Sequence, residues 1–580
     1  MYEVIIVGSG ISGLMSAVKL AQSGMHVTML SYFESMRSAS CMAQGGINAA
    51  EPYLKDSPRI HFEETITGGG WLADQQAVMG MCEFAPKLIS MYDHMGVAFN
   101  RRDDGLPDTR YFGGMKYPRT HYSDTTTGLQ LLSALDGQAS RLEEQGLLKR
   151  ISGRDFVSAL IDDNECCCGC IVQDIHTMKL EAYKGRALII ATGSYAGLYG
   201  WSTTAALSNG AVVGQLMRQG IPIANPEFVQ FHPTAMAEGD KPRLISESAR
   251  GEGGRIWTLR NGKRWNFLEE MYPDFGNLVT RDEASRAIYK VVMEMGHGID
   301  GKRQVNLDIA SLSDEIRQHK LSNVIDIYKK FSGEDPEKVP MHVFPAPHYS
   351  MGGILVDKHH RTRIKGLYAC GECDYLYHGA NRLGGNSLLS ATYSGYICAD
   401  TILEDKEGQN QPKPCSSGDD GWISKEINLW ENEMNGYYRR SGNENAPQLT
   451  IELGELLTVN AGIIRNNALL AEALEKAMGM MERWQRVLVN DNGSWANASV
   501  LAVRKLRSCI VLAEAVIKGA LERNESRGAH YKPEFPGRDD GNWLKTTVAR
   551  FEDEEITLQY QAVDTSILSP LKGREEAVNT

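Results

Sequence analysis

A short glycine-rich segment near the N-terminus constrains the fold of this chain more than any other feature. Residues 4–7 are apolar without alternation, which predicts a strand buried on both faces. The run Gly8-Ser9-Gly10-Ile11-Ser12-Gly13 follows and matches the pattern G-x-G-x-x-G. A helix is predicted for residues 14–23 and a second strand for residues 26–30. In this strand–helix–strand context the glycines let the backbone and a helix N-terminus approach a pyrophosphate, so we predict dinucleotide binding.

Later segments favour FAD over NAD as the dinucleotide. Ser31 follows the second strand, at the place where an acidic residue usually binds the ribose. Residues 187–193 predict another apolar strand, which ends in Ala-Thr-Gly as in two-domain flavoproteins. Residues 366–372 predict a further strand that ends at Glu372, whose carboxylate can accept a hydrogen bond from a ribose hydroxyl.

The length of 580 residues predicts several domains, because single hydrophobic cores stop growing near ~250–300 residues. We expect an α/β fold with a Rossmann-like FAD-binding domain in two parts, residues 1–235 and 340–404. An α+β capping domain, residues 236–339, is inserted between the two parts. A polar stretch after residue 404 is typical of a linker. The helical periodicity within 405–525 predicts a helical domain, followed by a small C-terminal domain, residues 526–580.

Composition excludes several classes of partner. A net charge of −12 argues against nucleic acid, which is bound by basic surfaces. No apolar run approaches the ~20 residues of a membrane span. The chain enters an apolar strand directly, so we expect no signal peptide. The 11 cysteines lack the spacing of zinc or ferredoxin ligands, so we expect free thiols, a reducing compartment and no metal site.

Three charged or titratable residues lie among small residues, where backbone can approach a ligand closely. His232 precedes a proline, His348 lies shortly before a glycine pair, and Arg382 lies between an asparagine and another glycine pair. Each alone could be a satisfied core histidine or a surface arginine. Together they predict a site with several anion-binding groups, because guanidinium groups match carboxylates in geometry. Such a site suits a dicarboxylate.

Two further segments carry charges whose role depends on burial. Residues 246–254 combine Glu247 and Arg250 with glycines, which indicates either a buried charge network or a solvated loop. Buried members would have to pair, since an unpaired buried charge is costly. Arg281 precedes an expected helix with Asp282 as a possible N-cap, and by its residue type alone Arg281 is expected at the surface.

These motifs resemble one family across nearly the whole chain, the flavoprotein subunits of succinate dehydrogenase and quinol:fumarate reductase. The motifs that carry the resemblance are Gln44-Gly45-Gly46-Ile47-Asn48-Ala49, Phe112-Gly113-Gly114, residues 230–234, residues 247–254, Arg281-Asp282, residues 348–353, Gly371-Glu372-Cys373, residues 381–387, residues 525–530, and Arg538-Asp539-Asp540 with Trp543.

The resemblance implies hydride transfer between FAD N5 and an alkene carbon of fumarate. It implies that Arg281 delivers the proton to the other carbon and is resupplied through Glu247 and Arg250. A cationic clamp would stabilise the charge that grows on the carboxylate. The residues implied to bind the substrate are His232, Ser246, Glu247, His348, Arg382 and Phe112. The residues expected to bind the cofactor are Gly8, Ser9, Gly10, Ser12, Gly13, Ser31, Ser38, Ala39, Ser40, Gln44, Gly45, Gly46, Ala191, Thr192, Gly193, Glu372, Arg382, Asn386, Ser387 and Leu388.

The sequence departs from the family pattern at one position. Covalent members carry a histidine six residues before the first glycine of the Gln-Gly-Gly motif, and here that residue is Ala39. The resemblance therefore implies non-covalent FAD. It also implies a bias toward fumarate reduction, because in this family the covalent bond raises the flavin potential. Cys41 is a neighbouring thiol, which we do not expect to bond the flavin.

The resemblance also implies electron-transfer partners. An iron–sulfur subunit would carry electrons, and one or more membrane anchor subunits with quinone would hold the complex at the cytoplasmic face of the membrane. Three alternatives stay open: an L-aspartate oxidase-like flavoenzyme, another alkene reductase, and a flavin-containing electron-relay subunit without its own substrate. Residues 112–116 and 538–543 favour the respiratory subunits over the oxidase, and the clamp residues argue against the relay.

Overall fold

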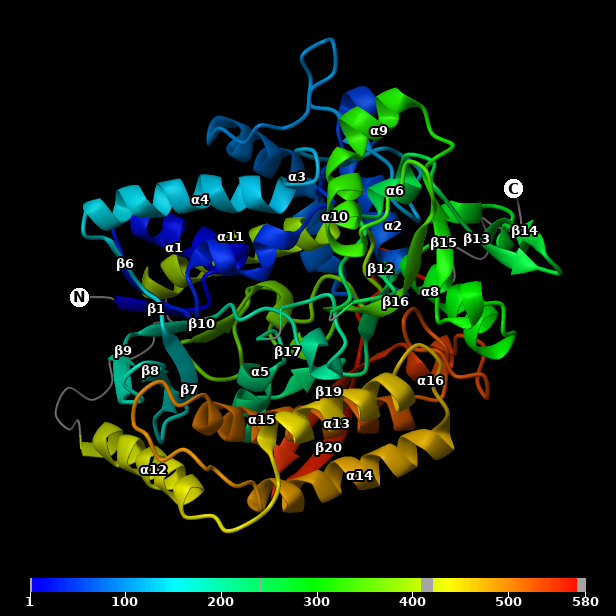
Figure 1. The fold of residues 1–580 in the computed structure, drawn as a ribbon. Coiled ribbons are helices and arrows are strands. Elements are labelled where there is room, and N and C mark those ends of the chain that lie inside the picture. The colour runs from blue at the N-terminus through cyan, green and yellow to red at the C-terminus, as the bar shows by residue number, and fades with distance from the viewer. Residues whose placement is uncertain (1–2, 206, 240, 408–420, 571–580) are drawn as a thin grey trace.

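A five-stranded parallel sheet organises the N-terminal part of the molecule (Figure 1). The computed structural model describes residues 3–205, 207–239, 241–407 and 421–570 of the chain. The strand order is β18-β10-β1-β2-β6. The strands are β1 (Glu3–Val7), β2 (His26–Leu30), β6 (Leu148–Ile151), β10 (Ala187–Ile190) and β18 (Leu367–Ala369). The side chains of Val4, Ile5 and Ile6 in the central strand β1 are fully buried, as predicted for a strand covered on both faces.

Helices that pack on one another cover this sheet, and the backbones of two of them, α1 (Ile11–Gln22) and α11 (Asn386–Glu407), are in contact. α1 packs on α11 and on α4 (Thr127–Glu144). A Cβ atom added at Gly395 of α11 would lie 2.3 Å from the carbonyl oxygen of Ser12, so only glycine fits there. Ser16 Oγ donates to the Gly395 carbonyl at 2.8 Å. The contact fixes the segment just before α11, which contains Arg382, relative to the glycine-rich turn before α1.

Smaller elements complete the part of the molecule built around the parallel sheet. β7, β8 and β9 form an antiparallel sheet beside the parallel one (Figure 1), and its buried strand β8 contains Cys167, Cys168 and Cys170. Burial raises the pKa of the Cys167 thiol in β8 to about 12. The bounds of the smaller elements are α2 (Pro58–Gly68), α3 (Gln75–His94), α5 (Ala211–Arg218), β3 (Ile47–Asn48), β4 (Thr109–Arg110), β5 (Thr120–His121), β7 (Arg154–Ile161), β8 (Cys167–Asp174) and β9 (Leu180–Lys184).

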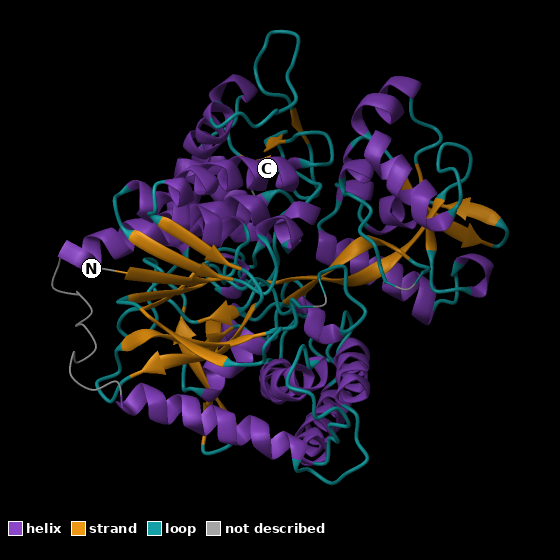
Figure 2. Ribbon diagram, turned by 60° about the vertical axis from the view of Figure 1, so that its left-hand side comes forward, coloured by secondary structure: helices purple, strands orange, loops and turns teal. Residues whose placement is uncertain are grey.

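An inserted capping unit has its own sheet and its own hydrophobic core. The sheet order is β12-β16-β15-β13-β14, with neighbouring strands antiparallel. Figure 2 shows this unit projecting to one side, connected to the rest by the long strands β12 and β16. The elements are β12 (Val229–Met236), α6 (Ser248–Gly251), β13 (Arg255–Arg260), β14 (Lys263–Trp265), α7 (Phe267–Met271), α8 (Arg281–Tyr289), β15 (Val305–Asp308), α9 (Asp314–Lys320), α10 (Ser322–Ser332) and β16 (Met341–Ser350).

The C-terminal part is helical and then returns to the part built around the parallel sheet. Its strand β19 pairs with β11 in a four-stranded sheet of order β17-β11-β19-β20. Residues near position 550 thus complete a sheet with residues 223 and 354. Figure 1 labels β17, β19 and β20 of this sheet. The elements are β11 (Ile223–Ala224), β17 (Gly353–Ile354), α12 (Gly421–Tyr438), α13 (Ala446–Asn460), α14 (Asn467–Gln485), α15 (Ala498–Glu522), α16 (Asp540–Trp543), β19 (Lys545–Glu552) and β20 (Glu555–Ala562).

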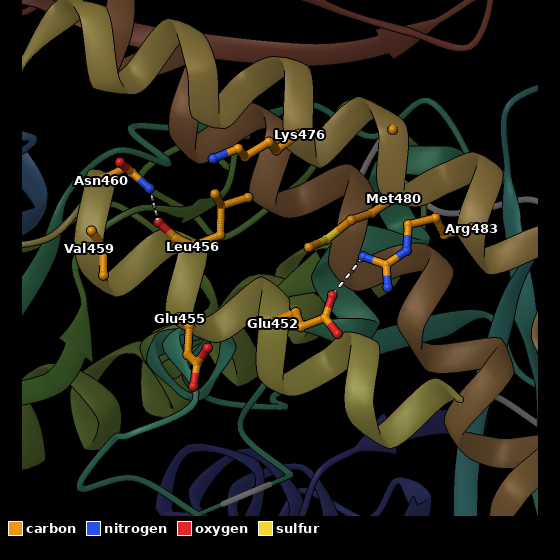
Figure 3. A pocket seen from close by; sticks show the side chains of 9 residues that line it. Glu452, Glu455, Leu456, Val459, Asn460, Lys476, Met480 and Arg483 are labelled. Carbon is orange, nitrogen blue, oxygen red and sulfur yellow. Dashed lines mark hydrogen bonds and ion pairs between the residues drawn. The ribbon is translucent and has the colours of Figure 1, made fainter. Parts of the chain in front are cut away.

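A groove of about 590 Å³ lies between α13 and α14 (Figure 3). Glu452 and Arg483 form an ion pair across it at 2.6 Å, and Leu456 and Met480 supply apolar lining. None of the predicted site residues lines this groove. It is therefore a surface feature of the helical part, separate from the cofactor and substrate residues.

The predicted fold class is confirmed: a Rossmann-like part built around the parallel sheet carries an inserted unit and is followed by helices and a small C-terminal sheet region. Among the helices that the structure describes, each one is too short or too polar to cross a bilayer.

Candidate active site

The glycine-rich turn between β1 and α1 leaves a helix N-terminus open to a ligand. Gly8 has φ +113°, and a Cβ atom there would lie 2.2 Å from the Ala191 carbonyl oxygen. α1 begins after Gly10, which has no side chain to cap the helix. Ser40 Oγ accepts from the Ile11 N–H at 3.1 Å. The remaining N–H groups of the first turn, together with the helix dipole, favour an anion such as a pyrophosphate.

Ser12 and Gly13 hold this turn against its neighbours. A Cβ atom at Gly13 would lie 2.1 Å from the Gly8 carbonyl oxygen, so the third glycine of the motif permits close packing of helix on strand. Ser12 Oγ lies 2.4 Å from the position of a Cβ at Gly371, at the end of β18. We therefore expect Ser12 and Gly13 to fix the shape of the turn rather than to contact a ligand through their side chains.

Buried polar atoms without a partner mark where a cofactor fits. Among the described residues, Ser38 Oγ, Gln44 Oε1 and Thr192 Oγ1 are buried and make no hydrogen bond. Buried polar atoms are almost always bonded in native proteins, so these three fit a ligand that brings hydrogen-bonding groups. Ala191 and Gly193 flank Thr192, and a Cβ at Gly193 would meet no atom within 4 Å, which leaves space there. The residues present therefore fit the dinucleotide that the turn predicts.

The residues expected near the ribose divide into two groups. Ser31 Oγ and Ser9 Oγ both donate to the Phe33 carbonyl, at 2.6 and 3.3 Å, so they fix the loop after β2 and keep only lone pairs for a ligand. Glu372 follows β18, and its Oε1 accepts from the Ser350 N–H at 3.0 Å. Burial raises the pKa of Glu372 to about 7. When ionised, its carboxylate is the acceptor that a ribose hydroxyl needs.

The turn that contains Ala39 offers no good nucleophile to a flavin. Ala39 begins a short 3₁₀ turn, Ala39–Met42. A methyl group cannot form the linkage that a histidine could. Cys41 Sγ donates to the Met36 carbonyl at 3.0 Å, and burial raises the pKa of its thiol, which reduces the reactive thiolate.

The segment Gln44-Gly45-Gly46, which is expected to bind the cofactor, packs against the ring of Phe112. Gly46 has φ +135°, and a Cβ there would lie 2.5 Å from the His121 carbonyl oxygen, so glycine is required. A Cβ at Gly45 would lie 3.1 Å from the Phe112 ring. A Cβ at Gly384 would lie 2.7 Å from the same ring and 2.9 Å from Glu247 Oε2. Phe112 therefore packs between the cofactor segment and the charged part of the site.

The side chain of Asn386 is used inside the protein. Its Oδ1 accepts from Asn48 Nδ2 at 2.7 Å and lies 2.9 Å from His61 Nε2, and its Nδ2 donates to Thr65 Oγ1 at 3.0 Å. Asn386 begins α11, followed by Ser387 and Leu388. What this segment can offer a cofactor is the backbone of a helix N-terminus rather than the Asn386 amide.

Glu247 lies between two arginines, Arg281 and Arg250. Arg281 Nε donates to Glu247 Oε2 at 2.7 Å, and Arg250 Nη2 donates to Oε1 at 3.0 Å. The Gly113 N–H also donates to Oε1, at 3.1 Å. All three charged side chains are buried, with Arg281 only 7% exposed. The sequence allowed either a buried charge network or a solvated loop, and the structure shows the buried network. Both oxygens of the Glu247 carboxylate accept hydrogen bonds, as a buried charge requires.

The electrostatics of this network favour the charged carboxylate. Burial alone would raise the pKa of Glu247, but Arg281 and Arg250 outweigh it and hold that pKa below its ordinary value. Burial lowers the pKa of Arg250, which makes loss of its proton easier than in water. A row of three groups that can exchange protons is thus held within hydrogen-bond distance.

His232 presents a protonated Nε2 atom in its neutral form. It lies on β12, where the register shifts on both sides of it, a bulge geometry that redirects side chains. The Thr234 N–H donates to His232 Nδ1 at 3.3 Å, so the proton of the neutral ring is on Nε2. That Nε2 is buried and has no partner among the described residues. Burial and Arg281 lower the pKa of His232 well below its ordinary value, so the ring is neutral at pH 7.

His348 and Arg382 complete a cluster of anion-binding groups. The rings of His348 and His232 lie 5.0 Å apart between centroids. Burial, then Arg281 and Arg382, lower the pKa of His348 well below its ordinary value. Arg382 stacks on the Tyr349 ring at 4.4 Å, and its buried Nε has no partner among the described residues. Burial, followed by repulsion from Arg281, lowers the pKa of Arg382 to about 9.

Ser246 precedes Glu247 in the chain and is buried, and its Oγ accepts from Ser248 Oγ at 2.8 Å, so its own hydroxyl hydrogen is available. The structure thus brings together His232, Ser246, Glu247, His348, Arg382, Arg281, Arg250 and Phe112.

Gln230 and Thr203 are two residues of the site that the sequence prediction missed. Gln230 Nε2 donates to the Arg382 carbonyl at 2.7 Å, and its Oε1 lies 3.3 Å from Arg281 Nη1. Gln230 lies two positions before His232. Because alternate residues of a strand point to the same face, this spacing could have indicated that Gln230 belongs to the site. Thr203 Oγ1 lies 2.8 Å from His348 Nδ1 and belongs to a loop without any motif.

Comparisons with known proteins agree with this geometry. Residues 3–388 match the family described as FAD binding domain, and residues 450–576 match the family described as fumarate reductase flavoprotein C-term. The succinate dehydrogenase flavoprotein subunit of Bacillus subtilis (strain 168) is 44% identical over 576 residues, with 98% of both chains covered. The fumarate reductase flavoprotein subunit of Escherichia coli (strain K12) is 31% identical, with 98% of this chain and 95% of that protein covered.

Solved structures give the same result. A structure of E. coli quinol fumarate reductase with a mutation in its FrdA subunit has a TM-score of 0.90 at 30% identity, covering 98% of both chains. The fold and the site define this chain as an FAD-dependent oxidoreductase. It belongs to the family of succinate dehydrogenase and fumarate reductase flavoprotein subunits.

Proposed function

We propose that this chain interconverts fumarate and succinate, with Arg281 as the proton donor and acceptor. The observation that carries the proposal is the position of Arg281. Its guanidinium is buried, is bonded to Glu247, and lies close enough to His232 and His348 to lower the pKa of both rings. A proton-carrying group therefore adjoins the anion-binding groups.

The residues of the clamp bind and orient the dicarboxylate. Neutral His232 donates through Nε2, and Arg382 supplies a guanidinium with an unused Nε. Donors that are already fixed in a buried site stabilise charge that grows on a carboxylate as the alkene is reduced, at little reorganisation cost. Phe112 packs beside them and helps to exclude water. FAD, when bound, supplies or accepts the hydride through N5.

Arg281 moves a proton to or from the second alkene carbon. An arginine has a pKa above ~12 in water and is a weak acid, so the loss must be transient and quickly refilled. Glu247 lies in contact with both arginines and can pass a proton from Arg250 to Arg281. The lowered pKa of Arg250 assists this refilling. One hydride and one proton convert fumarate to succinate.

The proposal includes non-covalent FAD and a bias toward fumarate reduction. Its basis is Ala39, which replaces the linking histidine of covalent members, and the pKa of the Cys41 thiol, which burial raises. Without the covalent bond, the flavin potential stays lower, which favours electron delivery to fumarate.

The proposal also includes partner subunits. The relatives are named as flavoprotein subunits, and one similar solved structure is described as quinol-fumarate reductase with menaquinol molecules. An iron–sulfur subunit would relay electrons between this FAD and quinone, and membrane anchor subunits would hold the complex at the cytoplasmic face of the membrane.

Product analysis tests the reaction directly. Purified FAD-loaded protein is given a reduced viologen dye and a limiting amount of fumarate without oxygen. We expect two dye electrons to be consumed per fumarate and succinate to form in equal amount. Consumption of L-aspartate with oxygen, without succinate formation from fumarate, would instead identify an aspartate oxidase.

A further inference from the structure

His348 can bind a carboxylate only if its proton is on the ring nitrogen that faces the substrate. For His232 the backbone N–H of Thr234 settles this, because a donor at Nδ1 leaves the proton on Nε2. His348 has no such backbone donor among its described bonds. Its Nδ1 contacts the hydroxyl of Thr203 at 2.8 Å, and a hydroxyl can either donate or accept.

The surroundings of Thr203 decide the direction of that bond. The Thr203 hydroxyl has a second acceptor within reach, the Pro347 carbonyl oxygen at 3.2 Å. This oxygen already accepts from Ser202 Oγ at 2.9 Å and from the Thr203 N–H at 3.0 Å. Both of these donors are closer to the oxygen than the Thr203 hydroxyl is, and a carbonyl oxygen has only two lone pairs, whereas His348 Nδ1 is the nearer acceptor for that hydroxyl. The Thr203 hydroxyl hydrogen is therefore directed to His348 Nδ1.

We propose that Thr203 is a positioning residue that keeps His348 in the tautomer protonated at Nε2, so that His348 donates to a substrate carboxylate. The proposal rests on the proposed function, because it assigns the substrate as a dicarboxylate. The two histidines then act as a matched pair of neutral donors. His232 is fixed by a backbone N–H, which every substitution of Thr234 except proline keeps, and His348 is fixed by a side chain, which a substitution can remove.

Loss of the Thr203 hydroxyl has a specific chemical consequence. Without a donor at Nδ1, the neutral ring of His348 can carry its proton on Nδ1 and present the lone pair of Nε2 to the substrate. A carboxylate only accepts hydrogen bonds, so this tautomer repels it. Binding should weaken, while hydride and proton transfer from other groups continue in the complexes that do form.

Three variants test this in the FAD-loaded protein. Thr203→Val keeps the shape and removes the hydroxyl, Thr203→Ser keeps the hydroxyl, and Thr204→Val removes a neighbouring hydroxyl that bonds Ser202 instead. We expect Thr203→Val to raise the KM for fumarate and the inhibition constant of malonate about tenfold, the size expected for a hydrogen bond to a charged group. The kcat should change much less. Thr203→Ser and Thr204→Val should resemble the wild-type protein.

Unchanged KM and malonate inhibition in Thr203→Val would overturn the proposal, and so would a failure of Thr203→Ser to restore them. Nitrogen-15 NMR of histidine-labelled protein gives a test that needs no activity, with the His348 signal assigned from a His348→Gln sample. The wild-type signal should be that of a ring unprotonated at Nδ1, and Thr203→Val should shift it. A wild-type signal showing a proton at Nδ1 would contradict the proposal. A correct signal in a protein inactive with fumarate would contradict the proposed function alone.

Discussion

Arg281, the first residue of α8, and Glu247 form the closest contact between this helix and the rest of the candidate site. Arg281 Nε and Nη2 lie 2.7 and 2.6 Å from Glu247 Oε2, while Arg250 binds the other oxygen. One carboxylate is thus shared by two guanidinium groups in a buried setting. The group as a whole keeps an excess of positive charge. In the proposed mechanism this charge suits a dianionic substrate, and Glu247 connects the proton donor Arg281 to Arg250.

Glu247→Gln should slow catalysis strongly. The amide keeps the size of the side chain but cannot carry a proton between Arg250 and Arg281. We expect kcat for fumarate reduction to fall about 100-fold, in the usual range for loss of a positioned acid or base. Glu252→Gln is the matched control, because Glu252 pairs with Lys320 at 3.2 Å outside the site. Equal rates in the two variants would show that Glu247 does not relay protons.

Gln230→Glu should weaken fumarate binding. Gln230 connects Arg281 to the Arg382 backbone, and a carboxylate at this position would neutralise Arg281 and repel the substrate. We expect the KM for fumarate to rise about tenfold, equivalent to ~1.4 kcal/mol. Steady-state kinetics measure it, with thermal unfolding as a check that the fold is retained. A lower KM than in the wild-type protein would mean that the substrate does not lie near Gln230.

The flavin should leave the protein on acid precipitation. Ala39 cannot form the linkage of covalent members, and the thiol of Cys41 has a raised pKa. After precipitation and centrifugation, we expect FAD fluorescence in the supernatant and none in the protein band of a denaturing gel. Fluorescence that stays with the band would show a covalent bond through another residue.

Glu525→Gln should destabilise the fold without touching the site. Glu525 bonds Arg523 and Arg527 at 2.8 Å each, and all three side chains are completely buried. The change removes one carboxylate partner from two buried guanidinium groups, which keep Glu227 and Asp540 as partners, so we expect a loss of ~1.5–3 kcal/mol, the size of a hydrogen bond to a charged group. The exposed pair Arg59–Glu63 gives the control, since Glu63→Gln should change stability by less than ~1 kcal/mol. Thermal unfolding of FAD-loaded samples compares the two, and similar midpoints would contradict the prediction.

Local patterns made much of the fold predictable from the sequence. The strand before Gly8 and the glycine-rich turn carry their signal within a few residues, so their structure follows from the sequence alone. The pairing of β19 with β11 does not, because it joins segments more than half the chain apart.

Site residues were predictable from the sequence where a charged or titratable residue lies among small residues. His232, His348 and Arg382 stood out on that basis, whereas Arg281 alone looked like a surface residue. The expectation that Asp282 caps the helix was wrong. Thr280 is the N-cap and forms a capping box with Glu283, so Arg281 is the first helical residue. Its burial depends on Glu247, a contact between distant segments that no local pattern reveals.

Fumarate-dependent reoxidation of a reduced viologen dye, measured anaerobically with wild-type protein and with Arg281→Ala, tests the central claim most directly. Arg260→Ala is the control, because Arg260 forms an exposed pair with Glu270. We predict rapid reoxidation by the wild-type and control proteins, and loss of it in Arg281→Ala although FAD remains bound. Substantial fumarate reduction by Arg281→Ala, or none by FAD-loaded wild-type protein, would contradict the account.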